Sequence, residues 1–339
     1  MVKEYVVAVV GATGAVGMKM TQLLEESSLA IKEIRLLSSA RSAGKSVYFR
    51  KKEVTILLAA PSSFEGVDIA LFSAGGDISR ALVPEAIKSG AICIDNTSAF
   101  RMDQDVPLVV PEVNEQALFT HKGLIANPNC STIQMVTALE PLRAVFGMER
   151  IVVSTYQAVS GAGAAAIDEL REQSTALSDE KEMKPTVFPH PIAFNCIPQV
   201  DSFHESGFTL EELKMMNETK KIMALPDLKV AATCVRLPVV TGHSESVYVE
   251  FERDGATVAD VKRLLHEAPG VTLQDDPSAL QYPMPIDCVD KKDVFVGRVR
   301  QDVDEPKGFH LWIVSDNLVK GAAWNSVQIA ERLMELKII

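Results

Sequence analysis

The sequence predicts an α/β protein with two domains, and three observations lead to this prediction. Strand-like runs alternate with helical patterns from residue 5 to about residue 130, as in a parallel sheet with crossover helices. A glycine-rich segment follows the first of these runs and opens the first helical pattern. With 339 residues, the chain is long enough for two domains that each bury a core of their own.

The composition argues against several classes of partner. The formal net charge of −11 disfavours binding to nucleic acid or to a membrane surface, although it says nothing about small anionic substrates. The longest apolar runs are far shorter than the ~20 residues that span a bilayer, and the N-terminus lacks the layout of a signal peptide. We therefore expect a cytoplasmic protein that binds neither nucleic acid nor membrane.

The first predicted strand covers residues 5–10, and a helix is expected to follow it to about residue 26. Between them the glycines have a GxxGxxG spacing, a variant of the dinucleotide-binding fingerprint. Glycines there allow a tight turn and a close approach of the backbone to a pyrophosphate at the helix N-terminus. A plain strand-to-helix connection is the alternative interpretation. The cofactor contacts expected in this turn are Gly11, Ala12, Thr13, Gly14, Ala15 and Val16.

The second predicted strand, residues 33–39, indicates which dinucleotide binds. Enzymes that use NAD usually have an acidic residue near this point, which binds the ribose 2′-hydroxyl. Here the strand ends in hydroxyl groups and an arginine, which suit a 2′-phosphate, so the sequence predicts NADP. A solvated basic loop is the alternative. The residues concerned are Ser38, Ser39, Arg41 and Ser42.

Two further strands are expected at residues 67–73 and 91–95, with a helix over residues 79–89 between them. Ligands of a parallel sheet gather at the carboxyl ends of its strands. The first of these ends carries Ser73, Ala74 and Gly75, which we expect to contact the cofactor. The second leads to Arg101, which is placed to bind an anion, with a surface salt bridge as the alternative.

Cys130 stands where an apolar run, residues 124–126, is interrupted by Asn127-Pro128-Asn129 and a helical pattern begins. The free amides and the positive dipole end of a helix N-terminus favour a thiolate over a thiol, and they could also stabilise an oxyanion. The sequence therefore predicts that Cys130 is a nucleophile, with a buried capping cysteine as the alternative.

The other four cysteines lie in apolar surroundings and are predicted to be small core residues. None of the five has CxxC or metal-ligand spacing, so no metal site is expected. Their odd number, in a chain without a secretion signal, predicts reduced thiols in a cytosol.

A nucleophilic cysteine beside a nicotinamide indicates aldehyde oxidation through a thioester, which requires a general base. Of the six histidines, His243 has the most informative neighbours. It opens a predicted strand after a Thr-Gly turn, and the strand before this turn carries Arg236. The turn could bring an anion-binding arginine and a titratable histidine to one rim. A structural histidine remains the alternative.

With Cys130, Arg236 and His243 together, the chain resembles the aspartate-β-semialdehyde dehydrogenases of the bacterial type over essentially its whole length. The segment Asn-Pro-Asn-Cys-Ser-Thr, residues 127–132, resembles the nucleophile motif of that family, and the glycine-rich opening matches as well. The resemblance implies a Rossmann-type dinucleotide-binding domain plus an α+β catalytic and dimerisation domain of the semialdehyde dehydrogenase/glyceraldehyde-3-phosphate dehydrogenase-like type. It also implies a homodimer.

The expected domain boundaries follow from this resemblance. The dinucleotide-binding domain is expected to comprise residues 1–130 and a closing helix in residues 319–339, and the catalytic domain residues 131–318. Within the catalytic domain, a polar helix and loop are expected over residues 168–183, with a lid or a dimer contact as the roles considered.

The resemblance also implies roles for individual residues. Cys130 would form the acyl-enzyme, His243 would be the acid and base, and Gln157 would orient the substrate. Arg236 would bind the α-carboxylate and Glu218 the amino group of the substrate. The phosphate ligands would be Arg101, Lys221 and Asn129, and further cofactor contacts would come from Ser160, Gly161 and Asn317. From its residues alone, the segment with Glu218 and Lys221 is simply a charged helical face.

The reaction implied is the reversible conversion of L-aspartate 4-semialdehyde, phosphate and NADP⁺ into L-4-aspartyl phosphate and NADPH. Its biosynthetic direction leads toward lysine, threonine and methionine. Two alternatives remain open. N-acetyl-γ-glutamyl-phosphate reductase shares the fold, NADP and a cysteine thioester, and an NADP-binding sensor without activity would need neither Cys130 nor His243.

Overall fold

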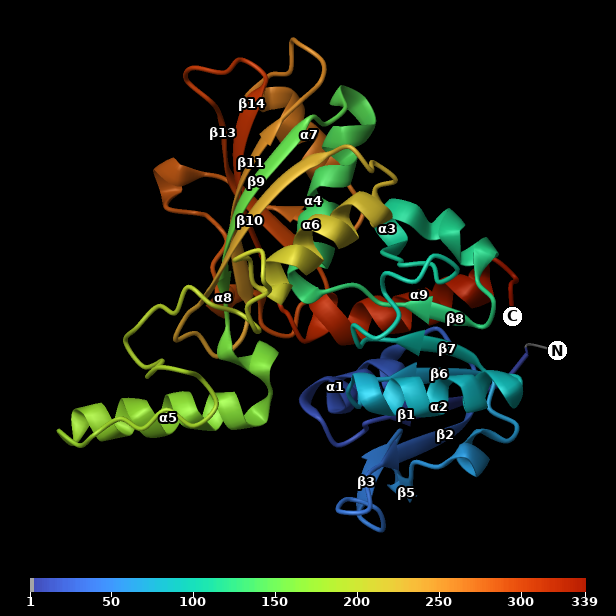
Figure 1. The fold of residues 1–339 in the computed structure, drawn as a ribbon. Helices are drawn as coiled ribbons and strands as arrows, with labels where there is room; N and C mark the ends of the chain where they lie inside the picture. Colours follow the sequence, from blue (N-terminus) through green and yellow to red (C-terminus); the bar gives the residue numbers. More distant parts are fainter. Residues whose placement is uncertain (1–2) are drawn as a thin grey trace. The chain divides into compact units, whose positions relative to one another are not determined.

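The computed structural model describes residues 3–339, which form two compact units (Figure 1). The first unit contains the described residues up to Asn129 together with Ala322–Ile339, and the second contains Cys130–Gly321. Cys130, which we expected to be the last residue of the first domain, is thus the first residue of the second unit. In the described residues, no helix has the length and apolar character needed to cross a bilayer.

The first unit is built on a parallel sheet of six strands. Its central strands β1 (Tyr5–Val10) and β6 (Ile69–Phe72) are apolar and almost wholly buried, as strands covered on both faces must be. The strand order is β5-β2-β1-β6-β7-β8, so β2 and β6 flank β1 on opposite sides. The remaining strands are β2 (Ile31–Ser38), β5 (Leu57–Leu58), β7 (Ile92–Asp95) and β8 (Leu124–Ala126).

The sheet order reverses at β1, and in open α/β sheets ligands bind at the carboxyl ends of the strands beside such a reversal. Helix α1 (Ala15–Glu26) begins after β1, and α2 (Gly76–Lys88) begins after β6. Helix α9 (Trp324–Glu335) returns to this unit, where it contacts α1 and β7. This topology confirms the Rossmann-type prediction. A short antiparallel hairpin, β3 (Ser46–Phe49) and β4 (Lys52–Thr55), was not predicted.

The second unit is built on a mixed six-stranded sheet with the order β10-β9-β11-β14-β13-β12. Strands β9 (Arg150–Gln157) and β10 (Lys229–Arg236) run parallel, and β11 (His243–Glu250) runs antiparallel to β9. This sheet confirms the predicted α+β class of the domain. The other strands are β12 (Val271–Leu273), β13 (Val294–Gln301) and β14 (Gly308–Ser315).

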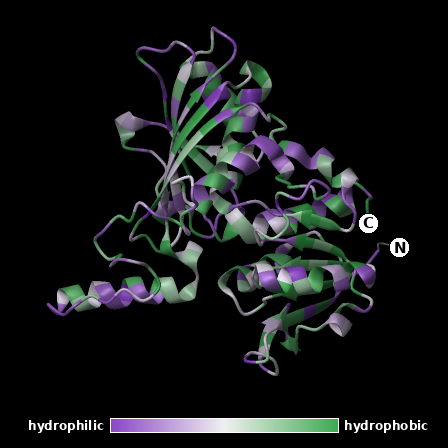
Figure 2. Ribbon diagram, in the orientation of Figure 1, coloured by the Kyte–Doolittle hydropathy of each residue, from purple (hydrophilic) through white to green (hydrophobic). Residues whose placement is uncertain are grey.

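Three helices cover one face of this second sheet: α4 (Cys130–Phe146), α6 (Leu210–Ile222) and α7 (Val258–Glu267) (Figure 1). Helix α4 lies between the other two and is buried on nearly every side, which explains its apolar sequence. Helix α5 (Ala164–Ser178) extends away from the sheet (Figure 1). Hydrophobic residues dominate the central strands of the first unit, whereas hydrophilic and hydrophobic residues mix along α5 (Figure 2).

Candidate active site

The sheet of the second unit brings three predicted site residues to one edge. Strands β9 and β10 run parallel and end at Gln157 and Arg236, which are paired in register. Strand β11 runs in the opposite direction, so that it begins at this same edge, with His243 as its first residue. The side chains of all three residues are buried. The topology therefore gathers an amide, a guanidinium and an imidazole from three separate segments.

His243 is a neutral side chain whose proton is on Nε2. Its Nδ1 accepts a hydrogen bond from the backbone N–H of Ala158 at 3.0 Å, so that Nδ1 carries no hydrogen. Complete burial, and then the positive charge of Arg236, hold the pKa of His243 well below its ordinary value. Within residues 3–339, Nε2 has no hydrogen-bond partner. A Cβ on Gly161 would lie 3.3 Å from Nε2, so this glycine leaves the space beside the donor open.

Arg236 is a buried cation held by the same backbone segment. One of its terminal nitrogens donates to the carbonyl of Ala158 at 2.6 Å, and the ring centroid of Phe188 lies 5.8 Å from its Cζ. Burial lowers the pKa of the guanidinium, and the negative charges of Glu211 and Cys130 oppose this effect. An arginine remains protonated in proteins, so this sheet edge holds a positive charge that can pair with an anion.

Cys130 is partly exposed at the first position of α4, so its predicted place at the start of a helix is what the structure shows. Its backbone packs closely against Gly321, where a Cβ would lie only 2.8 Å from the Cβ of Cys130. A side chain at position 321 would therefore displace the thiol. When Cys130 is ionised, its charge favours the charged form of Arg236, so the sulfur is coupled electrostatically to the cluster at the sheet edge.

A carboxylate and an amine from α6 complete the cluster. Gln157 Nε2 donates to Glu211 at 3.0 Å, and Gln157 Oε1 accepts from Thr155 Oγ1 at 3.0 Å. The second oxygen of Glu211 lies 3.3 Å from Nζ of Lys214, which also binds Asp201 at 2.6 Å. Glu211 and Lys214 were not among the residues predicted from the sequence.

The structure places another acid–lysine pair of α6 beside Gln157, in addition to the predicted Glu218 and Lys221. The residue of α6 that contacts Gln157 and acts on Arg236 is Glu211, in the first turn of the helix, and Lys214 pairs with Glu211. Glu218 lies on the same buried face but two turns later, about 10 Å farther along the helix axis. The spacing Glu-x-x-Lys occurs at both places in α6, so the pattern alone does not distinguish the two copies, and the roles of Glu218 and Lys221 stay predictions.

Ser160 and Asn317 support the turn that precedes His243. Asn317 Nδ2 donates to Ser160 Oγ at 2.9 Å, and Asn317 Oδ1 accepts from the backbone N–H of Gly242 at 2.9 Å. Both side chains are buried. The contacts give these two residues a structural role at the site, and their predicted contact with a cofactor stays a prediction.

In the first unit, the glycine-rich turn fits a dinucleotide. Gly11 has a φ of +87°, and a Cβ there would lie 2.4 Å from the carbonyl oxygen of Ser73. A Cβ on Gly17 would lie 2.2 Å from the carbonyl oxygen of Gly11. Gly14, in contrast, has no such close neighbour, so the amides at the start of α1 stay accessible. This is the arrangement that a pyrophosphate requires.

Hydroxyl groups gather at the end of β2, beside this turn. Thr13 Oγ1 lies 2.9 Å from Ser38 Oγ and 3.4 Å from Ser42 Oγ. Ser39 and Arg41 are exposed at the same strand end. The last predicted cofactor contacts, at Ser73, Ala74 and Gly75, lie between β6 and α2, where a Cβ on Gly75 would have no neighbour within 4 Å.

The predicted phosphate ligands Arg101 and Asn129 belong to the first unit, and both are buried there. Arg101 donates to the backbone carbonyl of Asn96 at 2.7 Å. Among residues 3–339 we find no group of three or more His, Cys, Asp or Glu side chains arranged to hold a metal ion.

Two protein-family models match the chain. Residues 6–121 match "Semialdehyde dehydrogenase, NAD binding domain", and residues 139–320 match "Semialdehyde dehydrogenase, dimerisation domain". Among curated relatives, the aspartate-semialdehyde dehydrogenase of Bacillus subtilis is 63% identical, with 98% of both chains covered. That of Aquifex aeolicus is 52% identical, with 99% of both chains covered.

Solved structures give the same result. Aspartate semialdehyde dehydrogenase II of Vibrio cholerae, complexed with ASA, superposes with a TM-score of 0.95 at 46% identity, with 98% of this chain and 99% of that chain covered. Aspartate semialdehyde dehydrogenase with NADP from Candida albicans has a TM-score of 0.78 at 26% identity, with 99% of this chain and 100% of that chain covered.

Proposed function

The chain belongs to the aspartate-semialdehyde dehydrogenase family, and from this premise we propose that it interconverts two aspartyl compounds with NADP as its cofactor. L-aspartate 4-semialdehyde, phosphate and NADP⁺ give L-4-aspartyl phosphate, NADPH and a proton, and the reverse direction serves the synthesis of lysine, threonine and methionine. The observation that carries the proposal is the cluster of Gln157, Arg236 and His243 at one sheet edge, with Cys130 in electrostatic contact with Arg236.

Cys130 is the nucleophile of the proposed reaction. In the reductive direction, Sγ bonds to the acyl carbon while the bond from that carbon to the phosphate oxygen breaks, so phosphate leaves and a thioester remains on Cys130. In the oxidative direction, phosphate attacks the thioester and Sγ leaves as a thiolate. The bound nicotinamide would supply or accept the hydride.

His243 stabilises the oxygen that develops negative charge when the acyl carbon becomes tetrahedral. The neutral ring donates a hydrogen bond from Nε2 to that oxygen. Once the ring has taken up a second proton from the thiol of Cys130, which becomes the thiolate, the imidazolium transfers a proton to that oxygen. Because Gly161 has no side chain, nothing at this position crowds the donor, whereas a Cβ there would lie 3.3 Å from Nε2. Loss of the proton from the resulting hydroxyl, as the carbon–sulfur bond breaks, returns it to His243.

The charged residues of the cluster match the substrate group by group. Arg236 binds the α-carboxylate, Glu211 binds the amino group, and Gln157 orients the acyl group between them. Lys214 supplies a positive charge for phosphate, a role proposed also for Arg101 and Asn129. An acetylated amino group would offer Glu211 no positive charge, which disfavours N-acetyl-γ-glutamyl phosphate as the substrate.

NADP is favoured over NAD by the hydroxyl groups and the exposed arginine at the end of β2, where no carboxylate is present for a ribose 2′-hydroxyl. The relative from Candida albicans contains NADP. A homodimer formed through the second unit is supported by the dimerisation-domain family that matches residues 139–320.

A reduction assay tests the function. With L-aspartate 4-semialdehyde, NADP⁺ should be reduced only when phosphate is present, and replacement by NAD⁺ should lower kcat/KM by at least about tenfold, because the 2′-phosphate contacts are lost. Faster turnover of N-acetyl-glutamyl 5-phosphate than of L-4-aspartyl phosphate in the reverse assay would reject the proposed substrate. Equal use of NAD⁺ would reject the cofactor assignment alone.

Arg236→Lys should raise the KM for L-aspartate 4-semialdehyde by about 10- to 100-fold, since the point charge of lysine does not reproduce the two parallel hydrogen bonds of a guanidinium to a carboxylate. Steady-state kinetics with this aldehyde measure the effect. Arg150→Lys is the matched control, because Arg150 lies half-exposed at the opposite end of β9. An unchanged KM in the Arg236 variant would move the carboxylate site elsewhere.

A further inference from the structure

An irregular segment of the second unit, residues 184–197, wraps around Arg236; we call it the arginine loop. The ring of Phe188 faces the guanidinium with its centroid 5.8 Å from Cζ. Farther along, the backbone of Ile197 pairs with that of Arg236 through two hydrogen bonds of 2.8 and 3.0 Å. The loop thus contacts Arg236 at both its side chain and its main chain.

Glu169 of α5 is hydrogen-bonded to the part of the arginine loop that precedes Phe188. Its Oε2 accepts hydrogen bonds from the backbone N–H of Thr186 at 3.0 Å, from the hydroxyl of Thr186 at 2.8 Å and from the backbone N–H of Val187. Burial raises the pKa of Glu169, but the hydrogen bonds from Val187 and Thr186 outweigh it, and the pKa lies below its ordinary value. The side chain is therefore an ionised carboxylate with only 2% of its surface exposed.

Gln173, one turn later on α5, holds the rest of the loop. Its Nε2 donates to Oε1 of Glu169 at 2.8 Å and to the carbonyl of Lys184 at 3.2 Å. Its Oε1 accepts from the backbone N–H groups of Ile192 and Ala193 at 2.7 and 3.1 Å. Two buried side chains of α5 therefore fix the arginine loop at its start, at its middle and beside Phe188.

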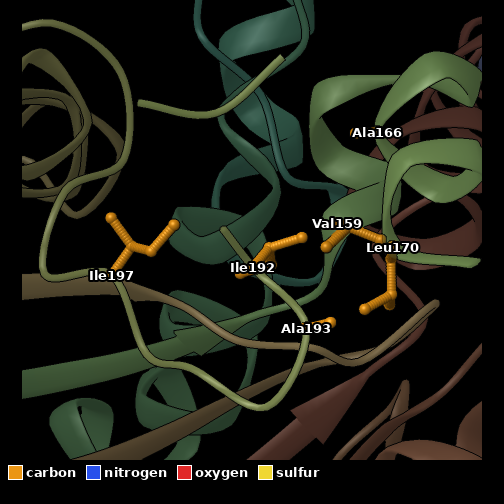
Figure 3. Packing of buried hydrophobic residues seen from close by; sticks show 6 residues of the cluster. All are labelled: Val159, Ala166, Leu170, Ile192, Ala193 and Ile197. Atoms are coloured by element: carbon orange, nitrogen blue, oxygen red, sulfur yellow. The ribbon is translucent and has the colours of Figure 1, made fainter. Parts of the chain in front are cut away.

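An apolar cluster joins this assembly to the site (Figure 3). Val159 lies in it, and Val159 directly follows Ala158, whose backbone binds both His243 and Arg236. Phe188 packs against the same cluster. The other members are Ala166, Leu170, Ile192, Ala193 and Ile197.

We infer that Glu169 is a positioning residue that fixes the arginine loop, so that Phe188 holds the guanidinium of Arg236 in one orientation toward the substrate carboxylate. This inference rests on the proposed carboxylate role of Arg236. An arginine loses much rotamer freedom when it binds, and fixing it beforehand reduces that cost. The aromatic face also attracts the cation and excludes water from one side of it, which strengthens the ion pair formed on the other side.

Glu169→Gln tests the inference. An amide offers only one acceptor oxygen, whereas Glu169 accepts hydrogen bonds from the loop on one oxygen and from Gln173 on the other. We expect the KM for L-aspartate 4-semialdehyde to rise about tenfold while kcat falls less than about threefold. Glu172→Gln is the matched control, because Glu172 is exposed on the same helix and loses the same charge. A control with the same KM shift would overturn the inference.

A double-mutant cycle with Arg236→Lys distinguishes an effect of Glu169 on the orientation of Arg236 from an effect on the stability of the site as a whole. If Glu169 acts through Arg236, Glu169→Gln should change the KM less than about twofold once Arg236 is replaced, because the two effects are not additive. Additive effects, or a fall in kcat as large as the rise in KM, would overturn the inference.

Phe188→Leu keeps apolar volume and removes the aromatic face, so it tests the same contact without touching Glu169. It should raise the KM about threefold with kcat nearly constant. An unchanged KM would overturn the role of Phe188, even if Glu169→Gln failed to fold. Absence of turnover of L-aspartate 4-semialdehyde by the unmodified enzyme would contradict the proposed function instead.

Discussion

Cys130→Ala is expected to lower kcat by at least about 10⁴-fold, because the variant has no atom that can carry the acyl group. Dissociation constants for NADPH should be unchanged, since the predicted cofactor contacts lie elsewhere. Steady-state kinetics in both directions and fluorescence titration with NADPH measure the two quantities. The volume lost at the start of α4 is small, and Gly321 leaves the backbone path as it is.

Cys196→Ala is the control for this prediction. The prediction that Cys196 is a core residue was wrong: it lies in an irregular loop, where its thiol is exposed, in the same unit as Cys130. The Cys196→Ala variant should retain full activity. Mass spectrometry of enzyme quenched with L-4-aspartyl phosphate should find the acyl group on the peptide that contains Cys130. An adduct on another side chain, or substantial turnover by Cys130→Ala, would refute the covalent mechanism.

His243→Gln is expected to lower kcat by about 10²- to 10⁴-fold, since the amide can donate a hydrogen bond near Nε2 but cannot transfer a proton. The fall should appear in kcat, with a smaller change in the KM for the aldehyde, because Arg236 remains in place. His266→Gln is the control, as His266 is exposed on α7. A variant with nearly full kcat would remove His243 from the proton transfers.

The His243→Gln variant also allows the effect of His243 protonation on the free energy of unfolding to be measured. In the unfolded chain this imidazole has a pKa near 6.5, and in the folded protein its pKa is well below that value. Below pH 6.5 the unfolded state therefore takes up a proton that the folded state excludes, so the free energy of unfolding falls as the pH is lowered. The difference between unmodified protein and His243→Gln, followed by urea unfolding from pH 8 to pH 5, should show this loss. A pH-independent difference would contradict the neutral, buried histidine.

The fold was predictable because local patterns repeat through the chain. Glycines at close approaches, such as Gly11 and Gly17, and the alternation of strands with helices required no knowledge of distant contacts. The placement of Arg236 and His243 at one sheet edge could also be predicted, because only a short connection separates the end of β10 from the start of β11, although β9 lies between the two strands. The strands of the β3–β4 hairpin were missed because each has only 4 residues, too few to show the alternation of a strand clearly.

The residues that α6 contributes to the site could not be predicted from the sequence, for a different reason. Glu211 and Glu218 are both followed three residues later by a lysine, and both lie on the buried face of one helix. Only the packing of α6 against β10 decides which turn meets Gln157. The capping box of Thr209 and Glu212 marks the helix start, and that signal could have directed attention to the first turn. The sequence did not indicate a role for Glu169, because the residues to which it is hydrogen-bonded lie in an irregular loop.

Ala158 has no side chain that could react, yet its N–H fixes the imidazole of His243 and its carbonyl holds the guanidinium of Arg236. Substrate selection and proton delivery thus depend on the same short piece of main chain. Efforts to retune this enzyme for uncharged aldehydes by remodelling the arginine pocket should therefore slow catalysis as well, unless the backbone path at position 158 is preserved. Directed evolution toward such substrates would be expected to leave that path intact and to accumulate changes on α5 and its loop instead.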